Sequence, residues 1–467
     1  MLKRMVLLLI VFSLLGAGLV QAQLQDVNTV CYQQGYLTPR LVGGMYARVV
    51  ADQPVTVYED FTTSSPVVGQ VEPGAVIPIN SAPRCVDGIV WWQSNFRPTQ
   101  GEGDTPFGWL PEGVNGTYLL EPSPQALNVP TRGQPITAEN FGQLQQVAQV
   151  EYGLINDLVW SPDSAYLAIS TVGAVWVHNL NGDPALVLKP NGLDSNMTTD
   201  TVYGTDGARI ATAGASANNE QTAPLLNIWS LADGTAQQTI TLPQREFSQV
   251  AAVTRDFSVM ATGAWDGKVM LWDLPAGTPR ATLEGHTLLG LLDFTPDGQT
   301  LVSAGSPGMM DSDMTVRFWD VATGTERGGV ELEGVPMYLA FNADGTLVAV
   351  PVTWNTSDTL ASAIHLIDTA TGAIVRTLPL SDAVTTLSFD PTGRWLAATS
   401  SYYDQTVQGW SGVVVLIDTG TGEQVGGLRL DADLRRVAFS PDGTLLAVAH
   451  ADPDFWGPDR INLWAVP

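Results

Sequence analysis

Residues 294–329 read FTPDGQTLVSAGSPGMMDSDMTVRFWDVATGTERGG, and this stretch is the unit around which the chain is built. A tight turn at Thr295–Gly298 precedes an apolar strand over Thr300–Ala304, and a further strand ends at Phe318–Asp320 before another glycine turn. Short apolar runs bounded by Asp-Gly and Thr-Gly turns are typical of antiparallel sheets. The stretch therefore predicts an all-β fold assembled from units of this kind.

Degraded copies of this unit recur at intervals of about 40–50 residues along the C-terminal two-thirds of the chain. The copies of the turn begin at Trp160, Tyr203, Val253, Phe294, Phe341, Phe389 and Phe439. The copies of the third-strand end centre on Trp176, Trp229, Trp272, Trp319, Ile367, Ile417 and Trp464. Together these segments resemble WD40 repeats, and the resemblance implies a seven-bladed β-propeller over Ile136–Pro467, with four strands in each blade.

The last repeat stops at Pro467 and leaves no room for a fourth strand. In the family that the repeats resemble, an N-terminal strand pairs with the C-terminal strands and closes the ring. Gln145–Glu151 is the segment expected to do so here. Closure of this kind removes free sheet edges.

The resemblance also implies a buried polar network in the repeat quoted above. His286 is expected to bond Asp313, and Ser303 and the indole of Trp319 are expected to complete the network. Buried polar groups that are all satisfied make a blade rigid, so we interpret His286 as structural. The remaining histidines, which are expected to be structural as well, are His178, His365 and His450.

The chain begins with a segment typical of a secretory signal peptide. Lys3 and Arg4 precede an apolar run over Met5–Leu15, and Val20 and Ala22 supply the small residues of a cleavage site within Met1–Ala22. The alternative is an uncleaved membrane anchor, although the run is short for a span. We expect an exported, extracytoplasmic protein, secreted or in the cell envelope, with no membrane span after cleavage.

The chain is strongly acidic, with a formal net charge of −26. Nucleic acids and anionic lipids both require a positive surface, so neither is an expected partner. A solvated acidic surface that keeps an exported protein soluble accounts for much of this charge.

A separate small domain is expected over Asp26–Glu121. VTVYEDFTTSSPVVGQVEPGAVIPI from Val55, CVDGIVWWQS from Cys85, FGWLPEG from Phe107 and YLLEP from Tyr118 resemble a bacterial SH3-like domain. The resemblance implies a small β-barrel that binds peptides or cell-wall components. Its aromatic residues either line a groove or fill a small core; they are Tyr58, Trp91 or Trp92, and Trp109. Pro122–Pro135 carries four prolines and is expected to be a semi-rigid linker.

The two cysteines of the chain, Cys31 and Cys85, both lie before the repeats. In an oxidising compartment such a pair usually forms a disulfide, and a reactive thiol is the alternative. No motif for a nucleophile, a zinc site or a phosphate loop is found, and no cofactor is expected. Asp residues cluster in two loops, where calcium is an open alternative to ordinary turn residues; they are Asp311 and Asp313, and Asp452, Asp454 and Asp459.

The connections between second and third strands are enlarged and aromatic in the last three repeats. Their rings are Trp354 in the fifth repeat, Tyr402, Tyr403 and Trp410 in the sixth, and Phe455 and Trp456 in the seventh. Exposed aromatics with a polar rim are typical of interaction sites, whereas packing of the loops onto the ring is the alternative.

These observations favour a non-enzymatic binding or scaffold protein whose loop face binds a protein or glycan partner. The SH3-like domain would tether it to envelope material. A propeller hydrolase or lyase that uses channel carboxylates, or a purely structural surface protein, remains the alternative, because fold alone does not fix function.

Overall fold

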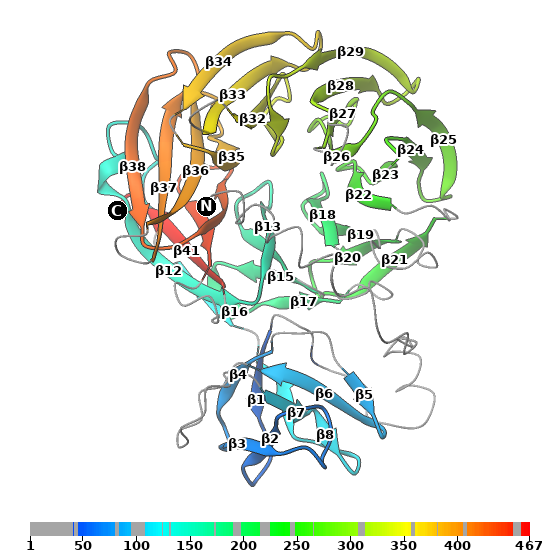
Figure 1. The fold of residues 1–467 in the computed structure, drawn as a ribbon, viewed down its shortest axis with the longest axis vertical. Coiled ribbons are helices and arrows are strands. Elements are labelled where there is room, and N and C mark those ends of the chain that lie inside the picture. Colours follow the sequence, from blue (N-terminus) through cyan, green and yellow to red (C-terminus); the bar gives the residue numbers. More distant parts are fainter. Residues whose placement is uncertain are drawn as a thin grey trace.

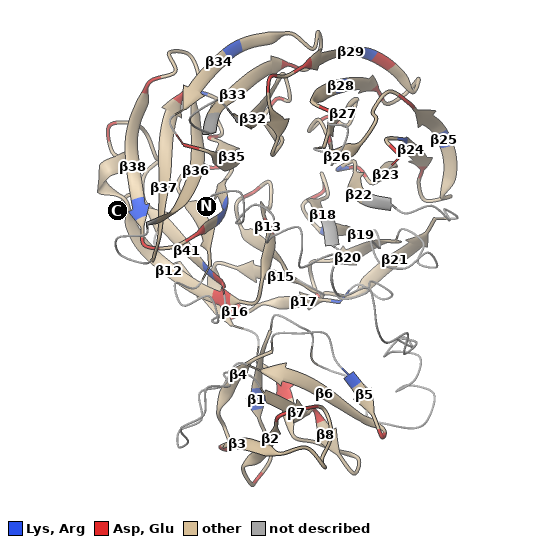
Figure 2. Cartoon of the chain, in the orientation of Figure 1, with Lys and Arg blue, Asp and Glu red and all other residues tan. Residues whose placement is uncertain are grey.

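The computed structural model describes residue 41 and residues 45–79, 84–94, 108–123, 125–129, 132–171, 174–189, 198–214, 225–242, 248–264, 266–306, 313–355, 360–380, 382–404, 409–451 and 459–467. Within these residues the chain forms a ring of antiparallel sheets with a smaller β unit beside it (Figure 1). Acidic residues occur in both parts (Figure 2). No helix in the described part of the chain is long and apolar enough to cross a membrane.

The ring consists, in the described residues, of seven antiparallel sheets that we number by the order of their inner strands. Sheets one to three contain β13 (Ile155–Trp160), β14 (Tyr166–Thr171), β15 (Ala174–Asn179) and β17 (Leu186–Leu188); β18 (Thr198–Tyr203), β19 (Arg209–Gly214), β20 (Leu225–Ser230) and β21 (Ala236–Thr241); and β22 (Ser248–Val253), β23 (Val259–Ala264), β24 (Val269–Asp273) and β25 (Thr278–Leu283).

Sheets four to six contain β26 (Leu289–Phe294), β27 (Thr300–Gly305), β28 (Thr315–Asp320) and β29 (Thr325–Glu331); β30 (Val335–Pro336), β31 (Ala340–Phe341), β32 (Leu347–Asn355), β33 (Leu360–Asp368) and β34 (Ile374–Leu380); and β35 (Val384–Phe389), β36 (Trp395–Asp404), β37 (Gly409–Asp418) and β38 (Gln424–Leu430). Sheet seven contains β39 (Leu434–Phe439), β40 (Leu446–His450), β41 (Asp459–Ala465) and β12 (Gln145–Tyr152).

The recurring turn between first and second strands is held by its aspartate. Its carboxylate accepts the backbone N–H two residues further on, at Asp163, Asp206, Asp256, Asp297, Asp344 and Asp442. The next residue adopts a left-handed backbone, which suits glycine. Ser164 and Phe257 occupy that position with φ of 61° and 59°. Their strain is offset locally, because Asp442 N–H bonds the Ser164 hydroxyl and Phe257 is buried beneath Arg209.

The strand predicted to close the ring is present. β12 pairs antiparallel with β41, from Gln145 opposite Ala465 to Tyr152 opposite Asp459, with one irregularity after Gln146. Sheet seven therefore combines the last three strands of the chain with a strand that precedes sheet one. A short 3₁₀ turn, η2 (Phe141–Gln143), leads into β12.

The smaller unit also consists of short strands. One sheet has the order β10 (Leu120–Pro122), β1 (Tyr46–Val49), β4 (Val76–Pro78). A second has the order β3 (Val67–Val71), β2 (Val55–Tyr58), β7 (Gly108–Pro111), β6 (Ile89–Ser94), β5 (Arg84–Val86), and β8 (Gly113–Val114) pairs with β9 (Thr117–Tyr118).

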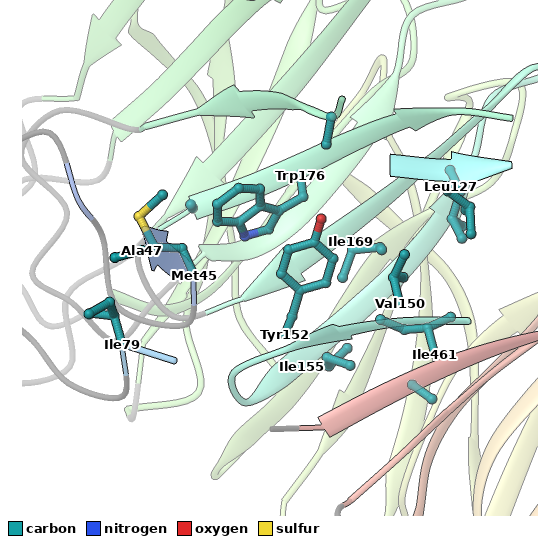
Figure 3. Packing of buried hydrophobic residues seen from close by; sticks show 14 of the residues in the cluster. Met45, Ala47, Ile79, Leu127, Val150, Tyr152, Ile155, Ile169, Trp176 and Ile461 are labelled. Atoms are coloured by element: carbon teal, nitrogen blue, oxygen red, sulfur yellow. The ribbon is translucent and has the colours of Figure 1, made fainter. Parts of the chain in front are cut away.

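The smaller unit and the ring share a hydrophobic core. Met45, Ala47 and Ile79 of the unit belong to the same buried cluster as Tyr152 of β12 and Trp176 of β15 (Figure 3). Full burial of a Met or Ile side chain typically contributes about 1.5–3 kcal/mol, so this contact fixes the unit against the seam of the ring, where sheets one and seven meet.

The segment expected to be a linker, Pro122–Pro135, includes strand β11 (Ala126–Asn128). β11 pairs with β16 (Asn181–Pro184), which follows β15 in sheet one. The segment is therefore attached to the ring over part of its length.

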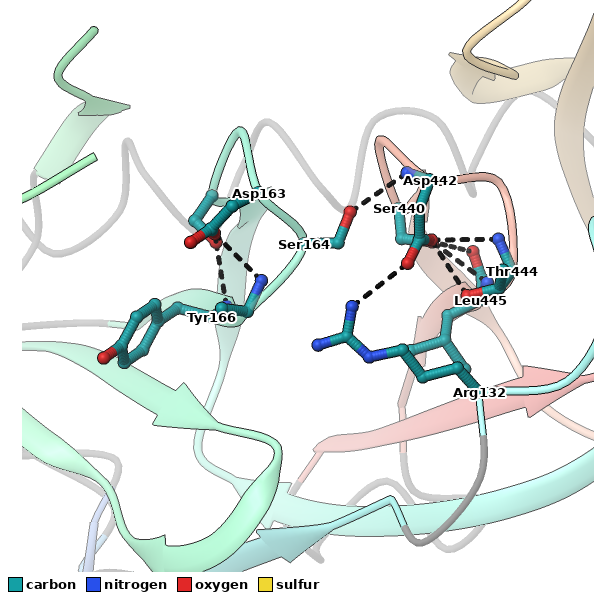
Figure 4. A network of polar contacts seen from close by, with 10 residues as sticks. Arg132, Asp163, Ser164, Tyr166, Ser440, Asp442, Thr444 and Leu445 are labelled. Carbon is teal, nitrogen blue, oxygen red and sulfur yellow. Dashed lines mark hydrogen bonds and ion pairs between the residues drawn. The ribbon is translucent and has the colours of Figure 1, made fainter. Parts of the chain in front are cut away.

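On the face opposite the smaller unit, polar contacts between the turns of sheets one and seven close the seam (Figure 4). Asp442 N–H donates to the Ser164 hydroxyl at 3.0 Å, and Arg132 pairs with the Asp442 carboxylate at 3.0 Å. The Trp160 indole N–H donates to the carbonyl of Ala438 at 3.2 Å. The seam where the two ends of the ring meet is thus joined on both faces.

Candidate binding face

Two strand pairs are longer than the corresponding pairs elsewhere in the ring. β36 and β37 contain 10 residues each, and β32 and β33 contain 9 each. The equivalent strands of sheets one and two contain 6. At about 3.3 Å per residue, the β36–β37 hairpin extends roughly 13 Å further than these strands.

The aromatic residues of the β36–β37 hairpin lie at its extended end. Tyr402 and Tyr403 are both well exposed, at 46% and 40%. Tyr403 lies opposite Trp410 in the strand register, and their rings meet edge to face with centroids 5.8 Å apart. The hairpin therefore carries three predicted site residues, of which Tyr403 and Trp410 are in contact.

The two tyrosines face opposite sides of the hairpin, because side chains alternate along a strand. Ala397 is an even number of positions from Tyr403 and therefore shares its face of the strand, and it belongs to the core between sheets six and seven. Ala398 shares the face of Tyr402 in the same way, and it belongs to the core between sheets five and six. Tyr403 and Trp410 thus lie on the sheet-seven side, and Tyr402 on the sheet-five side.

Trp354 is positioned differently. It packs against the core formed between sheets four and five, together with Val350 and Val352. A Cβ at Gly334 would lie 3.1 Å from its ring, so the indole rests directly on that glycine. Trp354 therefore faces away from Tyr402, and Phe455 and Trp456 lie outside the described residues.

Acidic residues occur in the two connections that flank this hairpin. Asp382 lies between β34 and β35, and Asp431 and Asp433 lie between β38 and β39. Asp433 is 3.6 Å from Arg435, and burial raises its pKa while Arg435 and the Ser401 hydroxyl lower it. The Ser401 hydroxyl also accepts the backbone N–H of Leu434 at 2.8 Å. Negative charge thus borders the base of the hairpin's extension near Ser401, which we call the foot of the hairpin.

A second cluster of polar residues, which includes Asp200 and Asp293, lies on the inner strands that surround the ring axis. Burial, followed by the charge of Asp293, raises the pKa of Asp200 well above its ordinary value. Burial raises the pKa of Asp293 to about 7, and the charge of Asp157 adds to this. These two carboxyls therefore favour the protonated form much more than ordinary aspartates do.

Basic and phenolic groups face the same axis. Arg436 Nε lies 3.7 Å from the Asp157 carboxylate, and its guanidinium lies 5.7 Å from the centre of the Tyr338 ring. The Asp157 side chain keeps 34% exposure, and burial raises its pKa against the opposing effect of Arg436. Asp200 also accepts the backbone N–H of Val253 in the next sheet at 3.0 Å.

The predicted network in sheet four has good hydrogen-bond geometry. His286 Nδ1 lies 3.0 Å from Asp313 Oδ2, and Nε2 lies 2.7 Å from the Ser303 hydroxyl. The Trp319 indole donates to the same hydroxyl at 2.7 Å. Burial lowers the pKa of His286, against the opposing effect of Asp313. A neutral imidazole fits these contacts, with Nδ1–H donating to Asp313 and Nε2 accepting from Ser303.

Sheets two and three contain shorter versions of this network that sequence reasoning missed. The Trp229 indole donates to the Thr212 hydroxyl at 3.0 Å, and the Trp272 indole donates to Thr262 at 2.9 Å. A third-strand Trp aligned with a second-strand Ser or Thr was the available signal. These bonds have no histidine, so they do not form the four-residue set found in sheet four.

The other histidines also make local contacts. His178 Nε2 lies 2.6 Å from the Tyr152 hydroxyl, His365 Nδ1 lies 3.0 Å from Thr377, and His450 Nε2 lies 3.1 Å from Asn462. Among the described residues no group of three or more His, Cys, Asp or Glu side chains is placed to hold a metal ion. Asp459 accepts the N–H of Ile155 at 3.0 Å in the seam, whereas Asp311, Asp452 and Asp454 lie outside the described residues.

The aromatic residues of the smaller unit divide into core and surface. Trp91 and Trp92 are both 1% exposed, and the Trp92 indole donates to Glu112 at 2.7 Å. Tyr58 and Trp109 are half-buried and lie opposite each other in the register. Tyr58 meets Trp91 edge to face at 5.5 Å. The expected disulfide stays a prediction, because Cys31 lies outside the described residues.

Comparison with known sequences identifies the class of repeat. The family described as "WD domain, G-beta repeat" matches residues 238–273, 277–320 and 372–411. The chain therefore carries WD40 repeats on an all-β fold built of antiparallel sheets.

Three named proteins are similar to parts of the chain. It is 27% identical over 172 residues to WD repeat-containing protein SL1-17 of Schistosoma mansoni, which covers 36% of this chain and 53% of the relative. It is 28% identical over 99 residues to Coronin-like protein crn1 of Schizosaccharomyces pombe, covering 19% and 16%. It is 33% identical over 79 residues to Small ribosomal subunit protein RACK1 of Brassica napus, covering 17% and 22%. The chain spans about half or less of the length of these relatives.

Proposed function

We propose that this chain is an exported binding scaffold: a seven-bladed WD40 propeller that carries its partner site on the extended hairpin of the sixth blade. The observation that supports this most is the exposure of Tyr402 and Tyr403 at the end of a hairpin longer than its counterparts. Exposed aromatic rings on a rigid support are typical of protein-binding surfaces. The partner is a protein, in keeping with the WD40 repeats.

The smaller unit fits the role of an SH3-like tether in this proposal. It precedes the ring, and its half-buried Tyr58 and Trp109 supply a modest aromatic surface. Its attachment to the seam would hold the propeller in a fixed orientation relative to envelope material. Export rests on the N-terminal segment Met1–Ala22, which is outside the described residues.

Affinity capture tests the proposal. The mature chain and its Tyr402→Ala/Tyr403→Ala variant are used as baits in an extract of the cells that produce the protein, and captured proteins are quantified by mass spectrometry. Val375→Ala, which truncates a 55% exposed side chain on outer strand β34, is the matched control. A partner that the control retains and the tyrosine variant loses supports the proposal, whereas identical capture by all three baits contradicts it.

A second candidate function is acid–base catalysis at the ring axis. The observation that favours it is the pKa of Asp293 at about 7, because a general acid or base works best when its pKa is near the working pH. A hydrolase or lyase activity that Asp293→Asn abolishes, with folding intact, would support this candidate. Full activity in that variant would exclude Asp293 from the chemistry.

A further inference from the structure

We propose that the β36–β37 hairpin binds an extended, Lys- or Arg-bearing segment of a partner protein. This inference rests on the proposed binding function and specifies the chemistry of the partner. Three properties of the hairpin support it: its pairing, the direction of its two tyrosines and the charge at its foot.

The pairing of the hairpin favours an extended partner. β36 pairs with β35 only as far as Ser400, opposite Val384, and β37 pairs with β38 only from Gly412, opposite Leu430. Beyond these points the two strands pair only with each other among the described strands. Peptide groups on an open strand edge can accept another strand, which is a common mode of peptide recognition.

The tyrosines suit side chains that alternate along such a strand. Tyr402 faces the sheet-five side and Tyr403 faces the sheet-seven side, so successive residues of an extended segment would each find a ring on their own face. The face of a tyrosine ring attracts Lys and Arg side chains through the charge distribution of its π system. Trp410 supports the Tyr403 ring from across the strand pair.

The charge around the hairpin selects a cationic partner over an acidic one. Asp382, Asp431 and Asp433 border its foot, and Arg435 is paired with Asp433 at 3.6 Å. The chain as a whole carries a net charge of −26, which would repel an acidic segment as it approached. Complementary charge of this kind contributes specificity and association rate.

The test uses short synthetic peptides that alternate Thr with Lys, Thr with Glu or Thr with Gln, with binding to the full chain measured by fluorescence anisotropy. We expect the lysine peptide to bind and the other two to bind at least about tenfold more weakly. Tyr402→Ala/Tyr403→Ala should weaken lysine-peptide binding about tenfold, and Tyr402→Phe/Tyr403→Phe should retain it.

A charge control separates the hairpin from diffuse attraction by an acidic protein. Asp431→Asn lies beside the hairpin, whereas Asp266→Asn makes the same change in the connection between β23 and β24 of sheet three. Only Asp431→Asn should weaken binding. Equal effects of the two variants together with no effect of the tyrosine changes would overturn the proposal, and so would preference for the glutamate peptide.

The capture experiment described above distinguishes failure of the cationic-segment proposal from failure of the proposed binding function. If no peptide binds while capture still depends on Tyr402 and Tyr403, the cationic segment is wrong and the binding face stands. If capture is also independent of the tyrosines, both proposals are wrong.

Discussion

The Tyr46 hydroxyl donates a hydrogen bond to the Glu151 carboxylate at 2.9 Å and so joins the smaller unit to the strand that closes the ring. The same carboxylate accepts a bond from Arg460 Nε at 3.0 Å, and the backbone N–H of Glu151 donates to the Gln125 side chain at 3.1 Å. One residue of β12 therefore connects β1, the segment before β11 and the last strand of the chain.

This arrangement predicts that Glu151→Ala destabilises the ring and the smaller unit together. The change leaves the Tyr46 hydroxyl and Arg460 without their carboxylate partner, and part-buried bonds to charged groups each contribute about 1.5–3 kcal/mol. Thermal unfolding followed by circular dichroism should shift to lower temperature in a single transition. Tyr46→Phe, which removes one of these bonds, should produce a smaller shift, and two separated transitions would contradict the coupling.

Ring closure makes a second prediction. Deletion of the last strand, residues 459–467, removes the partner of β12 along its whole register and exposes the edges of both β12 and β40. Exposed edges promote aggregation, so the truncated chain should lose its cooperative transition and associate. Calorimetry and size-exclusion chromatography measure both effects. An unchanged melting transition would refute closure by these strands.

His178 predicts a dependence of stability on pH. Burial lowers its pKa from 6.5 to about 4, so the unfolded chain takes up a proton that the folded chain resists between those values. Its contribution is fully present above about pH 6.5 and is lost as the pH falls toward 4, which amounts to about 3 kcal/mol. Asp293 acts in the opposite sense, because its raised pKa contributes stability that is lost as the pH rises through about 7.

The His178 contribution can be isolated by comparing the chain with His178→Gln between pH 7.5 and 4.5 in chemical denaturation. The variant is expected to be less stable at neutral pH and to lose less stability on acidification. Parallel pH profiles for the two proteins would show that His178 does not titrate as described.

The network in sheet four predicts a graded cost of removing hydroxyls. Ser303→Ala leaves both His286 Nε2 and the Trp319 indole without a partner in a buried site, at about 1–3 kcal/mol for each group. Thr212→Val in sheet two is the matched variant, because it leaves only the Trp229 indole unpaired. Urea unfolding should show the larger loss for Ser303→Ala, and equal losses would argue against the contribution of His286.

Much of the ring could be predicted from sequence because its signals are local. The Asp-containing turns, such as Thr295–Gly298, specify strand pairs over a few residues, and the closing strand followed from the missing last strand after Trp464. His286, Ser303 and Asp313 could be assigned together because their roles are fixed by position within one repeat.

The candidate site was less predictable because it depends on which face each side chain occupies. Trp354 has the same parity as Val350 and Val352, and this alternation was a readable sign that it packs against sheet four. The cluster of Asp157, Asp200 and Asp293 around the ring axis could not be recognised, because these residues are far apart in sequence and approach only when the ring is closed. The contact of Tyr46 with Glu151 is equally non-local.

Site-specific photocrosslinking is the sharpest test of whether the hairpin of sheet six binds the partner. A photoreactive phenylalanine analogue replaces Tyr402 in one protein and Val375 of outer strand β34 in another, and both are irradiated in the producing cells. We expect a discrete protein adduct from position 402 and none from position 375. Adducts of equal yield from both positions, or no adduct from 402 in a folded protein, would contradict it.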